Sequence, residues 1–447
     1  MFDTVLIANR GEIALRILRA CRMLDLRTVA ICSQADRDSR WLQKADQVLC
    51  IGPTPAGQSY LDHEAILYAA RETGAGAIHP GYGFLSENAG FAEKVEAEGL
   101  VFIGPASQVI RQMGDKIAAK QAMQAAGVPC VPGPSTPLPD DPAKVRALAG
   151  ALGFPVIVKA AGGGGGRGMR VVHTAQELDQ AVPLTREEAR KAFGNPMLYL
   201  EKYLDRPRHI EIQVLCDSHG NAIHLGERDC SLQRRHQKVI EEAPAPGIAR
   251  EAIEDLGALC TRACRQIGYR GLGTFEFLYQ DGIFAFIEMN TRVQVEHPVT
   301  EMVTGIDLLR AQIMVAQGQP LPWRQQDIRI RGHALECRIN AEHPETFLPS
   351  PGRVTRLDLP GGPGVRIDTH MVQGDVVPPS YDAMIGKLIA HGIDRTDALR
   401  RMEGALAETV IEGIRTNILF HRRLLQDPKV REGGPTIHHL EAFLANE

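Results

Sequence analysis

The chain has 447 residues, of which 44% are hydrophobic and 23% charged, as expected for a globular protein of two or three domains. Its net charge of −4 and the absence of a face-wide basic excess argue against nucleic acid as a partner. No run of about 18 apolar residues and no basic leader occurs, so neither a membrane span nor export is expected. Nine cysteines without zinc spacing favour reduced thiols in a cytoplasmic protein.

Residues 1–128 are predicted to form an N-terminal α/β domain. Apolar strand-like runs alternate there with helical patterns over residues 12–23 and 66–72. This alternation predicts a parallel sheet with helical crossovers. The expected strands are residues 5–8, 28–32, 48–51, 77–79 and 101–103.

A cluster of prolines between residues 129 and 142 predicts a domain junction, because neither a helix nor a central strand accommodates it. A small second region, residues 129–203, follows the junction. The third region, residues 204–447, ends in two helical patterns around 399–410 and 418–425.

The second region contains a run of five glycines, residues 162–166, between predicted strands at 154–161 and 169–172. Glycines let backbone N–H groups approach phosphate oxygens closely. The run formally matches a dinucleotide fingerprint, but a strand follows it instead of a helix, and no Gly-Lys-Ser/Thr completes a Walker A loop. A flexible linker is the alternative. Lys159 at the end of the first strand favours a lid over the phosphates of ATP.

The segment 286–298 carries polar side chains at every even position from 288 to 296. On an extended strand they would share one face, which could hold a metal, an anion and a base. An amphipathic strand with a solvated face is the plainer interpretation. The row consists of Glu288, Asn290, Arg292, Gln294 and Glu296.

A preceding strand around residues 274–279 and the turn at Asp281-Gly282 predict a hairpin with this segment. A plain two-residue loop would place Glu276 and Glu288 on opposite faces, whereas an odd loop or a bulge would place them together. Two carboxylates and an amide oxygen suit Mg²⁺ or Mn²⁺. We therefore expect the odd loop or a bulge.

These features resemble the ATP-grasp fold and, more narrowly, the biotin carboxylase family, over nearly the whole chain. The glycine-loop strand is shared with carbamoyl-phosphate synthetases, whereas residues 79–88 and 288–298 are far more specific. The matching segments are residues 79–88, 162–168, 227–238, 286–298, 336–340 and 381–387.

The resemblance implies a fold of mixed α/β and α+β class. Residues 1–128 would form a parallel α/β domain with contacts on the biotin side, and residues 129–203 the ATP-grasp lid. Residues 204–447 would form the ATP-grasp core and a C-terminal mixed domain, which carry the metal, bicarbonate and catalytic residues.

The resemblance also implies an ATP site and two ions of Mg²⁺ or Mn²⁺. A lone lysine or histidine is usually a solvated or satisfied side chain, but here many of them match the motifs in register. The ATP-binding positions would be Lys116, Lys159, Gly164, Gly165, Gly166, Met169, Glu201, Lys202, Leu204, His209, Gln233, His236, Leu278 and Glu288. The metal ligands would be Glu276, Glu288 and Asn290.

The implied reaction is the carboxylation of biotin through carboxyphosphate, with Glu296 as the base on bicarbonate. Two like charges about 4 Å apart repel by roughly 4 kcal/mol at an effective dielectric near 20, so cations must offset the approach of bicarbonate to the γ-phosphoryl group. The catalytic residues would be Glu296, Arg338, Lys238 and Arg292. Bicarbonate would be held by Lys238, Arg292, Gln294, Val295 and Glu296, and biotin by Tyr82, Gly83 and Arg338.

The chain contains no Ala-Met-Lys-Met motif, the site of biotin attachment in fused carboxylases. Biotin is therefore expected on a separate biotin carboxyl carrier protein. By resemblance, the other partners are the carboxyltransferase subunits of acetyl-CoA carboxylase and a second copy of the chain. This reaction would be the first half of malonyl-CoA formation for fatty acid synthesis, in a bacterial cytoplasm or a plastid.

Three alternatives remain open. The protein could serve pyruvate, propionyl-CoA or another carboxylase. It could be another ATP-grasp ligase, such as a carbamoyl-phosphate enzyme, although residues 79–88 and Arg338 would then not be needed. A non-catalytic homologue would be expected to lack a ligand or the base, and none is missing.

Overall fold

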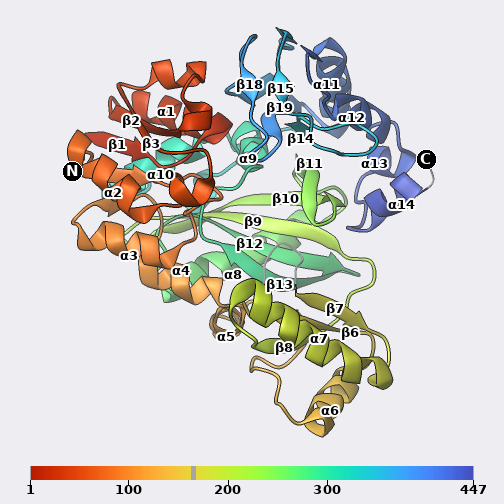
Figure 1. Cartoon of the computed structure of the whole chain (residues 1–447). Coiled ribbons are helices and arrows are strands. Elements are labelled where there is room, and N and C mark those ends of the chain that lie inside the picture. Colours follow the sequence, from red (N-terminus) through yellow and green to blue (C-terminus); the bar gives the residue numbers. More distant parts are fainter. Residues whose placement is uncertain (1, 163–167, 446–447) are drawn as a thin grey trace.

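The computed structural model describes residues 2–162 and 168–445. Three lobes surround a central sheet (Figure 1). The N-terminal lobe and the C-terminal helices lie on either side of the top of the view, and a small yellow-green lobe lies below the sheet. The fold is the predicted mixture of a parallel α/β domain with antiparallel sheets.

The N-terminal lobe contains a parallel sheet in the order β3-β2-β1-β4-β5, as the alternating pattern predicted. The strands are β1 (Thr4–Ile7), β2 (Arg27–Ser33), β3 (Gln47–Gly52), β4 (Ala77–His79) and β5 (Val101–Phe102). The helices are α1 (Gly11–Arg22), α2 (His63–Thr73), α3 (Ala89–Ala97), α4 (Ser107–Gly114) and α5 (Lys116–Ala125). Short 3₁₀ turns are η1 (Gln34–Asp36), η2 (Arg40–Lys44) and η3 (Ala56–Gln58).

The small lobe is an antiparallel sheet, β7-β6-β8, covered by two helices (Figure 1). Along β6, Val156 and Val158 are buried against the helices, while Lys159 faces the central sheet. The predicted strand pair around the glycine run is confirmed, but Gly164, Gly165 and Gly166 lie outside the described residues. The elements are α6 (Pro142–Leu152), β6 (Val156–Ala160), β7 (Met169–Val172), α7 (Ala175–Phe193) and β8 (Leu198–Lys202).

The central sheet is antiparallel, in the order β13-β12-β9-β10-β11-β14-β19-β17. Its strands are β9 (Arg208–Cys216), β10 (Ala222–Arg234), β11 (Gln237–Ala243), β12 (Gly271–Gln280), β13 (Ile283–Asn290), β14 (His333–Asn340), β17 (Val365–Thr369) and β19 (Met384–Gly392). Two small sheets pair β15 (Gly352–Arg353) with β18 (Val376–Val377), and β16 (Arg356–Asp358) with β20 (Val410–Glu412).

Helices pack on this sheet, α8 against β9 and β10 and α11 against β14 and β19, and the two predicted C-terminal helices are present as α11 and α12. The helices are α8 (Arg250–Gln266), α9 (His297–Thr304), α10 (Leu308–Ala316), α11 (Arg395–Glu408), α12 (Ile418–Leu424), α13 (Pro428–Glu432) and α14 (His439–Ala445), with the 3₁₀ turn η4 (Gln325–Asp327).

Both faces of the central sheet are buried, for different reasons. Along β9, Ile210 and Ile212 pack in an apolar core with α8, whereas Glu211 and Gln213 point to the opposite face and bind charged partners. Period-two alternation therefore separates an apolar face from a polar face. The polar face forms the floor of the candidate site.

The β12–β13 hairpin contains the predicted bulge. A two-residue turn pairs Gln280 with Ile283, and a register shift lower in the ladder brings Glu276 directly opposite Glu288. Ile287 is the extra residue in β13, because Phe277 pairs with Phe286. The two carboxylates therefore share one face, as expected.

The prediction that the strand continues through Glu296 is wrong. β13 ends at Asn290, and α9 begins at His297. The backbone N–H of Thr291 donates to Oε1 of Glu87 at 3.1 Å, so a loop of the N-terminal lobe takes the place of a neighbouring strand.

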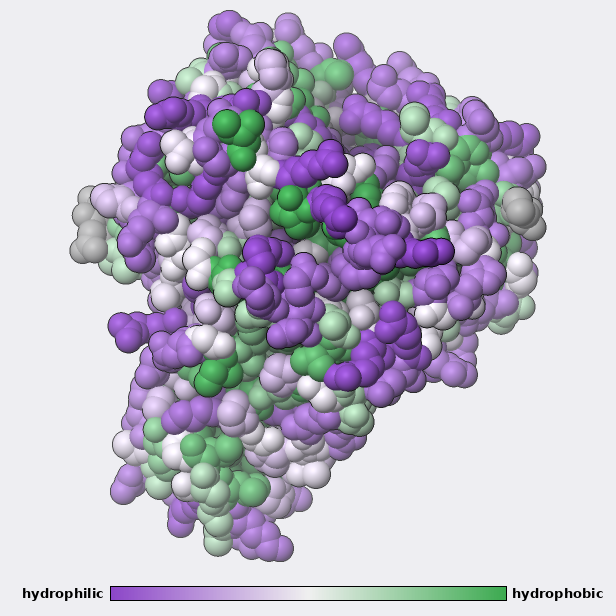
Figure 2. Space-filling model, turned by 180° about the vertical axis from the view of Figure 1, so that it is seen from behind, coloured by the Kyte–Doolittle hydropathy of each residue, from purple (hydrophilic) through white to green (hydrophobic). Residues whose placement is uncertain are grey.

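No helix among residues 2–162 and 168–445 is long and apolar enough to cross a bilayer. Seen from behind, the surface is largely hydrophilic, with apolar residues in small separate groups (Figure 2).

Candidate active site

A cavity of about 1160 Å³ lies where the three lobes meet the polar face of the central sheet. All but four of the predicted site residues line it. The predicted residues that line the cavity are Tyr82, Gly83, Lys116, Lys159, Met169, Lys202, Leu204, His209, Gln233, His236, Lys238, Glu276, Leu278, Glu288, Asn290, Arg292, Gln294, Val295, Glu296 and Arg338. The four exceptions are Glu201 and the three glycines outside the described residues.

Glu201 lies behind the cavity wall and binds one lysine of the small lobe, Lys159, and one of α5, Lys120. Its carboxylate accepts hydrogen bonds from Nζ of Lys159 at 2.7 Å and Nζ of Lys120 at 2.8 Å. Burial alone would raise the pKa of Glu201, but the two ammonium groups outweigh it and lower that pKa. Lys202 donates to the carbonyls of Gly153 and Phe154 and so ties β8 to the start of β6.

The hairpin presents an oxygen-rich cluster at the cavity floor. Glu276 accepts hydrogen bonds from Nδ2 of Asn290 at 2.9 Å and from Nζ of Lys238 at 3.0 Å. Glu288 pairs with Lys116 across the cavity. Two carboxylates and an amide oxygen are the donor set that a hard divalent cation prefers, so these residues fit Mg²⁺ or Mn²⁺.

Lys238 connects three carboxylates at the centre of the floor. Its Nζ lies 2.6 Å from Glu211, 3.0 Å from Glu276 and 2.5 Å from Glu296. Burial would lower the pKa of Lys238, but the three negative charges dominate and raise it well above its ordinary value. Lys238 is therefore a fixed cation at neutral pH.

Glu296 lies between two cations. Besides Lys238, its carboxylate accepts from Nη2 of Arg338 at 3.0 Å. Burial would raise the pKa of Glu296, but Lys238 and Arg338 outweigh this effect and hold the pKa well below its usual range. Glu296 is therefore ionised and able to accept a proton.

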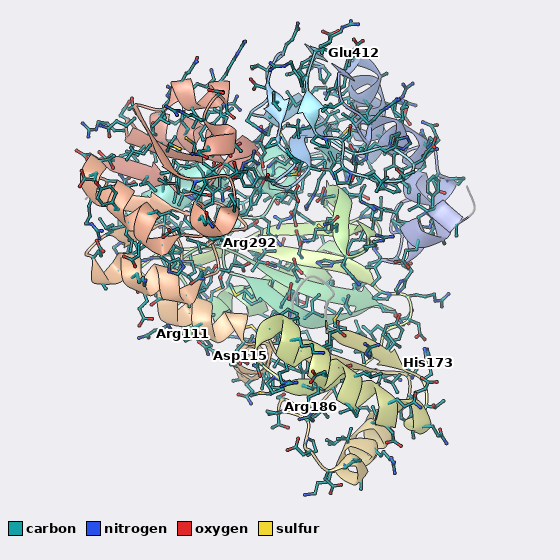
Figure 3. All side chains as sticks on the ribbon, in the orientation of Figure 1. Arg111, Asp115, His173, Arg186, Arg292 and Glu412 are labelled. Carbon is teal, nitrogen blue, oxygen red and sulfur yellow. The ribbon has the colours of Figure 1, made fainter. Side chains whose placement is uncertain are left out.

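Arg292 extends into the space between the N-terminal lobe and the central sheet, where Figure 3 labels it. Its Nε donates to Glu87 at 2.9 Å and its Nη2 to Asn290 at 2.8 Å. Arg292 is thus held by the N-terminal lobe and by the central sheet, although the segment that contains Arg292 is not a strand. The figure also labels His173 and Arg186 in the small lobe, at a distance from this centre.

The N-terminal lobe contributes the loop of Tyr82 and Gly83. The carbonyl of Tyr82 accepts from Nδ2 of Asn9 at 2.7 Å, and its hydroxyl donates to Glu12. Gly83 has a φ of +66°, a backbone conformation that residues other than glycine rarely adopt. These contacts fix the loop at the edge of the cavity, which Arg338 also lines.

Sequence reasoning missed the charged layer beneath the floor. The guanidinium of Arg228 is fully buried and donates to Glu211 at 2.6 Å, to Gln213 at 2.7 Å and to Gln294. Arg228 belongs to a matched motif, but no role was assigned to it. Glu211 could have been found because it follows His209 by two residues on the same strand face. Glu87 also belongs to a matched segment, residues 79–88, whereas Lys120 and Glu241 carried no comparable signal.

We expect acid to destabilise this centre. The pKa values of Glu276 and Glu296 lie below the ordinary 4.5, chiefly because cations outweigh the effect of burial. A carboxylate with a lowered pKa contributes stability above its unfolded pKa, and that stability is lost as the pH falls through the folded pKa. The thermal unfolding midpoint should fall steeply below about pH 4.5, and Glu276→Gln should weaken this dependence. A midpoint drop of equal steepness in the variant would contradict this assignment.

Three domain families match the chain. The biotin carboxylase N-terminal domain matches residues 1–110, the ATP-binding domain of the carbamoyl-phosphate synthase L chain residues 115–324, and the biotin carboxylase C-terminal domain residues 336–442. Among curated relatives, the biotin carboxylase of Allochromatium vinosum is 62% identical over 444 residues, covering 99% of each protein. A pyruvate carboxylase subunit from Methanothermobacter thermautotrophicus is 49% identical, covering 99% of this chain and 90% of that protein.

Solved structures agree with these relatives. The chain superimposes on the biotin carboxylase from Campylobacter jejuni, solved as a β-γ-ATP complex, with a TM-score of 0.96 at 47% identity and 99% coverage of both chains. The biotin carboxylase domain dimer of 2-oxoglutarate carboxylase from Hydrogenobacter thermophilus, solved with MgADP and bicarbonate, gives 0.94 at 46% identity, covering 99% of this chain and 98% of that one. The chain therefore belongs to the biotin carboxylase family of ATP-dependent ligases.

Proposed function

We propose that the protein carboxylates biotin held by a separate biotin carboxyl carrier protein, using bicarbonate and ATP. We assign it to the first half-reaction of acetyl-CoA carboxylase, the committing step toward malonyl-CoA and fatty acids. The observation that carries the proposal is the ionised Glu296 between Lys238 and Arg338. Glu296 lies within a cavity that is also lined by the lid residues Lys159 and Lys202. A base between two cations suits the deprotonation of one anion as it attacks another.

ATP would lie between the small lobe and the central sheet. Lys159 and Lys116 would neutralise its phosphates, and the backbone near Lys202 and Leu204 would contact the adenine edge. The remaining contacts would come from Met169, Glu201, His209, Gln233, His236, Leu278, Glu288 and the glycines 164–166. A divalent cation on Glu276, Glu288 and Asn290, with a second ion beside it, would supply charge screening for the phosphates.

Bicarbonate would be held by Lys238, Arg292, Gln294 and the backbone of Val295. Glu296 takes the proton from bicarbonate while a bicarbonate oxygen forms a bond to the γ-phosphorus and the bond to ADP breaks. The resulting carboxyphosphate decomposes to carbon dioxide and phosphate. The phosphate removes the N1 proton of biotin, and N1 then attacks carbon dioxide to form the carboxylated ring.

Arg338 would stabilise the negative charge on the ureido oxygen of biotin during this attack. Tyr82 and Gly83 would contact the biotin ring from the N-terminal lobe. The depressed pKa of Glu296 makes it a weak base in the free protein. Bound bicarbonate would compete for Lys238 and raise that pKa toward the value that the reaction needs.

We propose a homodimer that acts in the cytoplasm with the carboxyltransferase subunits. We propose that the domains comprise residues 1–128, 129–203 and 204–447. The 49% identity to a pyruvate carboxylase subunit keeps pyruvate as a second candidate for the final acceptor.

The test is ADP release by the purified protein with Mg-ATP and bicarbonate, with and without free biotin. We expect turnover that requires bicarbonate and increases with biotin. A rate of ADP release that does not increase with biotin but increases with ammonia would refute the proposal and indicate another ligase. Addition of a carboxylated carrier to acetyl-CoA or pyruvate, with the matching carboxyltransferase, would then identify the acceptor.

A further inference from the structure

Two buried glutamates lie behind Arg338 and have no part in the chemistry above. Glu241 on β11 and Glu336 on β14 are directly opposite each other in the antiparallel ladder, so their side chains share one face of the sheet. Both residues are 0% exposed. Like charges at directly opposed positions repel each other.

The hydrogen bonds of the two residues are unequal. Oε1 of Glu241 accepts from Nε of Arg338 at 2.6 Å. Oε2 of Glu241 and both carboxyl oxygens of Glu336 have no hydrogen-bond partner among residues 2–162 and 168–445. A buried ionised carboxylate without a donor is so unfavourable that the group takes up a proton instead.

Within the described part of the chain, Glu336 forms no ion pair, and the nearby charges of Lys387 and Arg338 only partly offset the effect of its burial. Nζ of Lys387 donates to the carbonyl of Val295 at 2.9 Å and lies 3.3 Å from Glu12. Burial raises the pKa of Glu336 well above its ordinary value and the pKa of Glu241 to about 7. The titratable and charged groups around the pair are Arg338 and Cys337 on β14, Lys387 on β19, Lys238 on β11, Cys230 on β10, Glu296 just before α9, and Tyr82 after β4.

We propose that Glu241 and Glu336 hold one proton between them at neutral pH, and that this singly charged pair positions Arg338. Nη2 of Arg338 lies 2.5 Å from Glu241 and 3.0 Å from Glu296, so the guanidinium is shared between the pair and the base. A second negative charge in the pair would draw the guanidinium away from Glu296 and the substrate. Both glutamates are positioning residues.

The proton is tested directly by difference infrared spectroscopy across a pH titration of the full chain. We expect the carbonyl band of a protonated carboxylic acid at pH 7, lost in Glu336→Gln. Glu227→Gln is the control. Glu227 is also buried, and its Oε2 has no partner among the residues that the structure describes. Its Oε1, however, accepts from the backbone N–H of Ala245 at 2.9 Å and pairs with Arg250, and the residue opposite Glu227 on β9 is Ile212. The band of the protonated carboxylic acid should remain in the Glu227→Gln variant. A wild-type protein without the acid band, or a Glu336→Gln variant that keeps it, would overturn the proposal.

The positioning role is tested by the pH profile of kcat/KM for free biotin. Glu336→Gln fixes the neutral form, so we expect a value within about threefold of wild type at pH 7 and a smaller fall on the alkaline side. Glu241→Gln removes the charge that holds Arg338 and should lower kcat/KM by about 10- to 100-fold. Superimposable profiles for Glu336→Gln and wild type would exclude the role.

This inference rests on the proposed function only for its kinetic readout. If no form of the protein shows biotin-dependent turnover, the proposed function fails, whereas the infrared band still decides whether the pair holds a proton. A normal thermal unfolding midpoint at pH 7 shows that a variant is folded. Because a raised carboxyl pKa makes the folded state less stable as pH rises, the midpoint of Glu336→Gln should exceed that of wild type increasingly toward pH 9.

Discussion

Glu296→Gln should reduce biotin-dependent ADP release by about 10²- to 10⁴-fold, the range over which a positioned base accelerates a reaction. The amide has the shape of the carboxylate but cannot take the proton of bicarbonate. ATP binding, measured by calorimetry, should persist because Glu296 belongs to the proposed bicarbonate contacts and not to the proposed ATP contacts. The measurement is the rate of ADP formation at saturating Mg-ATP, bicarbonate and biotin.

A matched control is Glu254→Gln, which removes an exposed carboxylate on α8, a helix that packs on the other face of the central sheet. It should leave the rate unchanged. If Glu296→Gln kept more than about a tenth of the wild-type rate, Glu296 would not be the base, since general base catalysis contributes more than that.

Lys238→Met should affect both stability and turnover. The substitution leaves Glu211, Glu276 and Glu296 without their shared ammonium, and removing one partner of a buried ion pair costs about 3–5 kcal/mol. We expect a clearly lower thermal unfolding midpoint at pH 7 and loss of bicarbonate-dependent turnover. Lowering the pH should restore part of the midpoint, because the unpaired carboxylates then take up protons.

Lys429→Met is the control for this prediction. Lys429 pairs with Glu432 at 2.8 Å, but its side chain is 49% exposed. An exposed pair contributes about 1 kcal/mol or less. Equal losses of stability in the two variants would show that Lys238 is not the hub of a buried network.

Much of the architecture could be predicted because its signals are local. Alternation of strand-like and helical runs predicted the parallel sheet. A count of residues around the two-residue turn alone would have placed Glu276 and Glu288 on opposite faces, and the bulge that brings them together was expected because two carboxylates suit a shared metal site. The end of β13 at Asn290 could not be predicted, because it depends on a contact that is distant in sequence. Glu87, which lies about 200 residues away, accepts a hydrogen bond from the backbone N–H of Thr291.

The site shows the same division. Residues within motifs that match a known family line the cavity as a group. Their partners were not foreseen: Glu211 beneath Lys238, Lys120 behind Glu201, and Glu241 behind Arg338. A charged side chain in a strand has no sequence signature that distinguishes a buried ion pair from a solvated face, since only tertiary packing decides its burial.

The extra residue in β13 also limits how this hairpin can vary in length. Because side chains alternate with a period of two, a single residue inserted or deleted elsewhere between Glu276 and Glu288, with the bulge kept, would turn one carboxylate to the apolar face, beside Phe275 and Phe277. Deletion of Ile287 itself would remove the bulge and leave the two carboxylates opposite each other. Two residues added together at the exposed tip would lengthen both arms and keep the carboxylates facing. Viable length variants that keep the bulge should therefore differ by even numbers of residues, even though the tip lies in solvent.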